Sequence, residues 1–210
     1  MSEQRLRDRI CQFGSLLYLR GYAHGSTGNI SVRLDDSILI TPTNSCLGLL
    51  DPARISRVAL DGALIDGDPP SKEAFLHLSM YQVRPSARSI VHLHCTHAVA
   101  VACLCHADRS NVLPTITAYH AMRVGTVPLI DYYRPGDRGL ADAVRAEAER
   151  HHAVLLANHG PVVAGTSLED AVYTAEELEE TAKLSLLLHG RPTQFLTPVQ
   201  IAELNAAFPS

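Results

Sequence analysis

Several features that mark other protein classes are scarce or absent in this chain of 210 residues. It contains no tryptophan, and aromatic residues make up only 5% of it. Lys and Arg number 18 against 22 Asp and Glu, which leaves a net charge of −4. Nucleic-acid binding depends on an excess of basic charge, so we expect no nucleic-acid partner.

Cysteine is present, but without the pattern of a disulfide framework. The five cysteines are an odd number and form no Cys-x-x-Cys pair, which favours reduced thiols and a cytoplasmic location. The charged residues near the N-terminus precede only a short apolar stretch, unlike a signal peptide. No apolar run reaches the length of a membrane span, so we expect no membrane partner.

The hydrophobic residues, 46% of the chain, are arranged in alternating helix-like and strand-like patterns. The length suits one domain with a substantial core, and no linker or repeat divides it. Strands are predicted over residues 30–34, 38–41, 57–60, 89–94 and 153–157. Helices are predicted over residues 3–20, 71–82, 96–105, 136–150 and 166–190, with Ser71, Asp137 and a Thr166–Glu169 capping box at three of the starts. This alternation predicts an α/β layered fold for residues 1–210.

Three histidines lie at the ends of two predicted strands. His92 and His94 are two residues apart, and because strand side chains alternate between faces, both imidazoles should point the same way. His159 begins a turn directly after the strand that ends at Ala157. A lone histidine in an apolar run is more often a hydrogen-bonded core residue, but the shared face and the turn favour ligation here. Three imidazoles leave coordination positions open, which is typical of a catalytic metal site.

Glu73 lies in the first turn of the helix predicted over residues 71–82. The helix dipole alone favours a carboxylate there. The same helix leads directly into the histidine strand, so its start can fold back beside the metal. Glu73 could then act as a general base. His77, one helical turn further on, is expected to reach the site only through another side chain.

Two segments, Ser26–Asn29 and Thr41–Ser45, combine hydroxyl and amide side chains in the way that anion-binding loops do. Ser71 and Lys72 add a hydroxyl and a cation at a helix start, where anions are also favoured. The same residue types make ordinary turns. Their joint presence predicts a pocket for a phosphate or another anion.

Five short motifs, taken in their order and spacing, resemble those of the class II aldolase/adducin family over nearly the whole chain. They are Thr27–Ser31, Thr41–Thr43, Pro70–Glu73, His92–His94 and Asn158–Gly160. The resemblance implies a single three-layer α/β/α domain with a central, largely antiparallel sheet, assembled as a homotetramer. It implies one divalent metal ion per subunit, usually zinc, with manganese or another divalent ion as the alternative. The implied metal ligands are His92, His94 and His159, and Glu73 would handle the proton.

The resemblance also implies a substrate and a reaction. The implied phosphate pocket consists of Gly28, Asn29, Thr43, Asn44, Ser71 and Lys72. Three longer segments, Pro70–His77, Val91–His97 and Tyr132–Asp137, are closest to the decarboxylases of 3-oxo-tetronate 4-phosphate. Such an enzyme is a carbon–carbon lyase that releases carbon dioxide and forms dihydroxyacetone phosphate through an enediolate stabilised by the metal. Tyr119 is a predicted proton donor to an oxygen of that intermediate.

Two other functions remain open. The same site could serve an aldolase of the L-fuculose-1-phosphate type or an L-ribulose-5-phosphate 4-epimerase. From a different class, an adducin-like interaction domain without catalysis is the third reading. The three histidines disfavour this last reading, because such domains have lost them.

Overall fold

The computed structural model describes residues 1–134 and 136–208, which are built around one eight-stranded sheet of order β4-β3-β2-β1-β5-β8-β7-β6. Pro135, part of the segment Tyr132–Asp137, and the last two residues of the predicted domain lie outside the described residues. The strands are β1 (Asn29–Arg33), β2 (Ser37–Ile40), β3 (Ser56–Ala59), β4 (Leu64–Asp66), β5 (Ser89–His92), β6 (Leu129–Ile130), β7 (Ala153–Leu156) and β8 (Gly160–Gly165). Within the described ranges, every neighbouring pair is antiparallel except β6 and β7, which are parallel.

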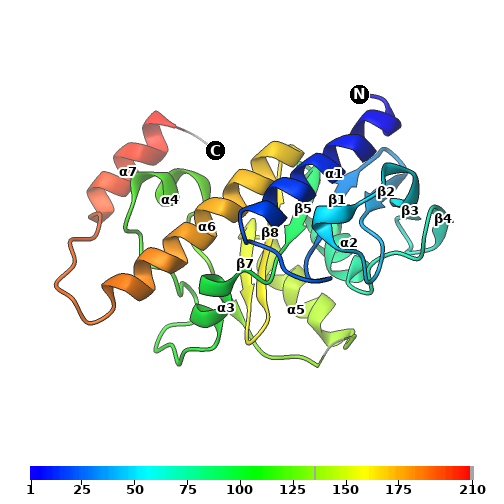
Figure 1. Cartoon of the computed structure of the whole chain (residues 1–210). Helices are drawn as coiled ribbons and strands as arrows, with labels where there is room; N and C mark the ends of the chain where they lie inside the picture. The colour runs from blue at the N-terminus through cyan, green and yellow to red at the C-terminus, as the bar shows by residue number, and fades with distance from the viewer. Residues whose placement is uncertain (135, 209–210) are drawn as a thin grey trace.

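Helices cover both faces of this sheet. The helices on one face are α1 (Glu3–Leu19), α3 (Thr96–Ala102) and α6 (Leu168–Leu188), and those on the other are α2 (Ala74–Val83) and α5 (Gly139–Ala148). Figure 1 shows α1 and α6 crossing in front of the strands. Strand alternation divides the core in two: Val91 of β5 packs with the first set of helices and Ile90 with the second. The predicted three-layer α/β/α fold with a largely antiparallel sheet is therefore confirmed.

Several helix starts differ from the prediction by one to three residues. The helix predicted from Ser71 begins at Ala74, and Glu73 occupies the cap position. The helix predicted from residue 136 begins at Gly139. The predicted Thr166–Glu169 capping box is wrong by one residue, because the extended residue is Ser167, whose hydroxyl accepts a hydrogen bond from the Asp170 amide.

Some elements were not predicted at all. They are α4 (Ala118–Arg123), α7 (Pro198–Ala207), the strands β4, β6 and β8, and the 3₁₀ turns η1 (Leu47–Leu49) and η2 (Pro52–Arg54). The start of α7 carried a usable signal, since Thr197 and Gln200 form a complete capping box with a proline at the first helical position. In the ranges described, no helix has both the length and the apolarity needed to cross a bilayer.

Candidate metal centre

The strand register brings residues from distant parts of the chain to one end of the sheet. β5 lies between β1 and β8, and His92 pairs with Asn29 on one side and Val162 on the other. β8 begins at Gly160, so the preceding His159 lies at the same end of the sheet as His92. His94 lies two residues beyond the end of β5, whereas the sequence had predicted that it lies on the strand. Its position is fixed by the segment that leads into α3.

Close backbone approach holds the His159 turn against the end of β5. A Cβ atom at Gly160 would lie 2.2 Å from the carbonyl oxygen of Leu93, a distance that no side chain tolerates. Asn158, just before His159, has the left-handed φ of 56° that asparagine accepts more readily than most residues. The turn therefore presses directly on the segment between His92 and His94.

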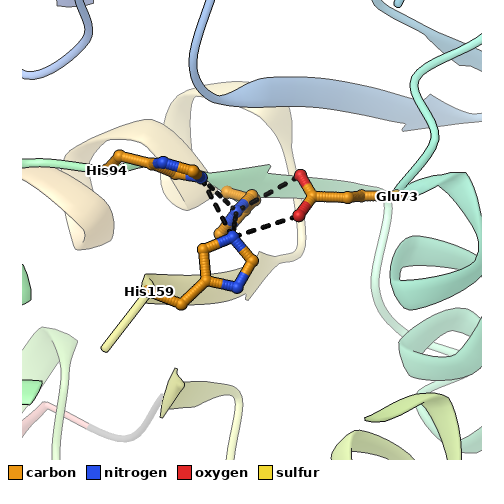
Figure 2. Close-up of side chains that lie close together, drawn as sticks. Glu73, His94 and His159 are labelled. Carbon is orange, nitrogen blue, oxygen red and sulfur yellow. Dashed lines mark hydrogen bonds and ion pairs between the residues drawn. The ribbon is translucent and has the colours of Figure 1, made fainter. Parts of the chain in front are cut away.

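Four side chains converge there, and we call Glu73, His92, His94 and His159 the His–Glu cluster. The Nε2 atoms of the three histidines are 3.0 Å (His92–His94), 3.1 Å (His94–His159) and 3.3 Å (His92–His159) apart. Glu73 places Oε1 3.1 Å from the His159 Nε2 atom and Oε2 3.4 Å from the His92 Nε2 atom. Figure 2 shows Glu73 pointing at His94 and His159 from the opposite side. The sequence thus correctly identified the residues of one cluster.

The surroundings disfavour the charged form of His92 and His94. Burial lowers the pKa of His92, and burial together with the neighbouring imidazoles lowers the pKa of His94 to about 3. Burial works against ionisation of Glu73, but His92, His159 and the Asn29 amide outweigh it, so the pKa of Glu73 lies well below its usual value. His92 and His94 therefore offer neutral nitrogens beside a carboxylate, and such donors are what a divalent cation requires.

The geometry also fits a metal ion. The Nδ1 atom of His92 lies 2.8 Å from the Pro161 carbonyl oxygen, which can only accept, so His92 donates there and its Nε2 lone pair is free. A tetrahedral ion with metal–nitrogen distances of about 2.0–2.1 Å holds its ligand nitrogens about 3.3 Å apart. The observed nitrogen spacing of 3.0–3.3 Å is close to this value. His92, His94 and His159 could hold one ion and leave a coordination position open.

The loops of the predicted anion pocket lie side by side next to Glu73. The Thr43 amide donates to the Pro69 carbonyl at 2.9 Å, and the Ser71 amide donates to the Thr41 carbonyl at 3.1 Å. These bonds place Thr43, Asn44, Ser71 and Lys72 in one region. The Thr43 loop lines a cavity of about 230 Å³. Gly28, with a φ of +79°, lies against the carbonyl oxygen of His92, 3.0 Å from where a Cβ atom would be.

Asn29 is placed differently from what the sequence suggested. Its side chain is buried and committed at both ends: Nδ2 donates to Glu73 Oε2 at 2.8 Å, and Oδ1 lies 2.5 Å from His77 Nε2. The side chain is therefore engaged with Glu73 rather than free to meet a phosphate. Sequence reasoning missed this role. The sequence signal that could have revealed it is strand alternation, which puts Asn29 and Ser31 on one face of β1. In the structure this face contacts His77 and Tyr81 of α2.

Tyr119 lies away from the cluster. It is 59% exposed on α4 and lines a cavity of about 660 Å³ together with Gly165 and Thr166. Gly165 is the last residue of β8, and His159 precedes its first residue. Tyr119 is therefore at the opposite end of that strand from the His–Glu cluster, and a single chain does not bring the two together.

The chain is similar to known proteins over nearly its whole length. Residues 8–186 match the model of the class II aldolase and adducin N-terminal domain. The chain is 50% identical over 205 residues to the 3-oxo-tetronate 4-phosphate decarboxylase of Escherichia coli K12, covering 97% of each chain. It is 36% identical over 179 residues to the L-fuculose phosphate aldolase of Methanocaldococcus jannaschii, covering 85% of this chain and 93% of that one. The crystal structure of YgbL from Klebsiella pneumoniae superposes with a TM-score of 0.95 at 48% identity, covering 97% of this chain and 99% of that one.

Proposed function

The chain belongs to the class II aldolase and adducin family, and we propose that within it the protein is a metal-dependent decarboxylase. Its substrate would be 3-oxo-tetronate 4-phosphate, a small phosphorylated sugar acid, and its products dihydroxyacetone phosphate and carbon dioxide. The observation that carries this proposal is the 50% identity to a decarboxylase of that substrate over 97% of both chains. The His–Glu cluster supplies the chemistry that such a reaction needs.

His92, His94 and His159 would hold one divalent ion per subunit. Zinc is the proposed ion, because the spacing of the nitrogens suits a small tetrahedral ion, with manganese or another divalent ion as the alternative. When bound, the ion supplies Lewis acidity at the oxygens of the substrate beside the breaking bond. Three imidazoles would leave at least one coordination position of that ion for the substrate.

Residues of the protein itself would bind the phosphate and transfer the proton. Gly28, Thr43, Asn44, Ser71 and Lys72 would hold the 4-phosphate, which fixes the acid so that its carboxylate end lies over the cluster. The electron pair of the bond between the carboxylate carbon and the neighbouring carbon moves onto the adjacent carbonyl, carbon dioxide leaves, and an enediolate remains. One proton must then reach the carbon that lost the carboxylate. Because the Glu73 carboxylate is ionised at rest, it would first take a proton from water or from the substrate and then give that proton, directly or through water, to this carbon.

Tyr119 can take part only if copies of the chain associate, because within one chain it lies at the other end of β8. We propose a homotetramer in which this exposed tyrosine serves a neighbouring site. Exposed apolar residues on α7 and just after it, Val199 at 67% and Phe208 at 60%, support an interface there. Size-exclusion chromatography with light scattering tests the assembly, and a monomer at assay concentration would contradict it.

We also propose that residues 1–210 act as a single domain in the cytoplasm. The single sheet draws strands from residue 29 to residue 165, which supports one folding unit. Cys103 and Cys105 are free thiols on the surface, the state that a reducing compartment preserves.

The decisive experiment incubates metal-loaded protein with 3-oxo-tetronate 4-phosphate and follows carbon dioxide and the triose phosphate together. Equal amounts of both products are expected, and His92→Ala is the matched control that should yield neither. Cleavage of L-fuculose 1-phosphate or epimerisation of L-ribulose 5-phosphate, without release of carbon dioxide, would show the alternative enzymes. The 36% identity to an L-fuculose phosphate aldolase favours the aldolase as the second candidate. A preparation that never retains a metal would instead favour an adducin-like interaction domain.

A further inference from the structure

A line of buried hydrogen bonds runs from Glu73 into the layer between the sheet and α2. Asn29 Nδ2 lies 2.8 Å from Glu73 Oε2, and Asn29 Oδ1 lies 2.5 Å from His77 Nε2. His77 Nδ1 lies 2.7 Å from the Ser31 hydroxyl, which lies 2.9 Å from the hydroxyl of Tyr81. We call these five residues the Glu73–Tyr81 chain. Ser31, His77 and Tyr81 are almost completely inaccessible to solvent.

The direction of every bond in this chain follows from one fact, that the Glu73 carboxylate can only accept. Asn29 must therefore present its NH₂ group to Glu73, which leaves Oδ1 toward His77. That oxygen also only accepts, so His77 carries its proton on Nε2. The bare Nδ1 of His77 then takes the Ser31 proton, and Ser31 in turn accepts from Tyr81. All four hydrogen bonds thus donate toward Glu73.

The imidazole in the middle is neutral, as this ordering requires. Burial, followed by the nearby His92, lowers the pKa of His77 to about 3. A neutral imidazole has one donor and one acceptor nitrogen, and here both are used. The chain therefore has no unsatisfied group and a single consistent arrangement of protons.

We propose that His77 is a positioning residue for Glu73, acting through Asn29 to hold Oε2 as a fixed acceptor and leave Oε1 as the oxygen that exchanges the substrate proton. This inference rests on the proposed function of the His–Glu cluster and assigns a task to a residue behind it. Asn29 is an amide and does not pass protons on, so the Glu73–Tyr81 chain orients Glu73 and does not conduct protons. Oε1 lies 3.1 Å from the Nε2 atom of His159, whereas Oε2 accepts the hydrogen bond of the Asn29 amide.

A pair of variants of the same chemistry and different reach tests this role. The amide nitrogen of His77→Gln can take the position of Nε2 and still donate to Asn29. The shorter amide of His77→Asn reaches only the Nδ1 position. We expect His77→Asn to lower kcat about 10- to 100-fold, the usual effect of losing a partner behind a metal-site residue, with KM and bound metal unchanged. His77→Gln should restore most of that loss.

The matched control is Ser79→Ala. Ser79 carries a buried hydroxyl on the same helix and donates to the Phe75 carbonyl, away from Glu73, so activity should not change. In a Glu73→Gln background, His77→Asn should cause no further loss, because there is no carboxylate left to hold. Equal losses in the Gln and Asn variants, or a full additional loss in the double variant, would overturn the proposal.

A second measurement needs no catalysis. Long-range ¹H–¹⁵N correlation spectra of the whole protein, with His77→Gln used for assignment, should show His77 as the Nε2–H tautomer. Removal of Asn29's oxygen in Asn29→Leu should shift this signal. An Nδ1–H tautomer for His77 would refute the order of hydrogen bonds in the Glu73–Tyr81 chain, even if the protein decarboxylates its substrate. If the decarboxylation assay fails while the Nε2–H tautomer is found, only the proposed function is lost.

Discussion

Replacing Gly160 by alanine should disrupt the proposed metal site without replacing any of its proposed ligands. The new Cβ atom would lie 2.2 Å from the Leu93 carbonyl oxygen. A carbon and a carbonyl oxygen approach no closer than about 3.3 Å, so the two backbone segments must separate by about 1 Å. Gly160 follows His159, and Leu93 lies between His92 and His94. The whole displacement therefore falls between His159 and the other two histidines of the His–Glu cluster.

The expected loss follows from the small tolerance of metal coordination. Distances from metal to ligand must be correct to within about 0.2 Å, so a displacement of about 1 Å removes one ligand from the shell. We expect metal affinity to fall at least about 100-fold and turnover by a similar factor. Overpacking should cost about 1–3 kcal/mol of folding free energy. Metal content after dialysis, turnover, and urea unfolding measure the three effects.

Gly125→Ala is the control for replacing a glycine of unusual backbone geometry. Gly125 has a φ of +65°, but a Cβ atom there would meet nothing within 4 Å. It should lose about 1–2 kcal/mol from backbone strain and keep its metal and activity. If Gly160→Ala retained one tightly bound metal ion and normal turnover, close packing of the His159 turn would not be what assembles the site.

Three further predictions concern the cluster and the helices behind it. His94→Ala should bind less than one metal ion per chain and lose turnover. The unchanged protein, after its metal is removed with a chelator, should recover activity when a divalent ion is added. Recovery without any added ion would argue against a metal enzyme. Glu179 is buried on α6 and accepts hydrogen bonds from the amides of His97 and Ala98 at the start of α3. Glu179→Leu should therefore lower the free energy of unfolding in urea by about 2–4 kcal/mol. A loss below about 1 kcal/mol would show that the α3 amides find other partners. The pKa of His77 is about 3 in the folded protein against 6.5 when free, so the unfolded chain binds more protons between these values and stability falls as pH is lowered below about 6.5. The loss from this residue at pH 5 is about 2 kcal/mol, and the difference in unfolding free energy between pH 7 and pH 5 should be smaller by that amount in His77→Gln; an unchanged difference would mean that His77 is not buried as a neutral imidazole.

The fold and the members of the His–Glu cluster could be predicted from the sequence because their signals are local. Period-two and helical patterns identified most of the strands and helices that build the layers, and they identified α1 to within a residue. The spacing of His92 and His94 and the turn at His159 pointed to ligation before any contact was known. β6 has only two residues, and β8 begins with Gly and Pro, so neither shows a strand pattern in the sequence.

Other features depended on where distant segments meet. His94 was expected on a strand, but β5 ends at His92, and the segment that follows it aims the second imidazole. Asn29 looked like a residue of an anion-binding loop. Only the packing of β1 against α2 shows its amide held between Glu73 and His77. Tyr119 looked equally suitable for the site, yet the chain carries it to the other end of β8.

The sequence by itself determined the layered fold, the family motifs and the kind of chemistry that four side chains could support. Residue type and spacing suffice for these, because period and ligand preference are properties of short segments. The tertiary structure alone decided which oxygen of Glu73 is held by Asn29 and how closely the His159 turn approaches β5. Those relations join residues 44 or more positions apart through strand register and backbone contact, and no local pattern encodes them.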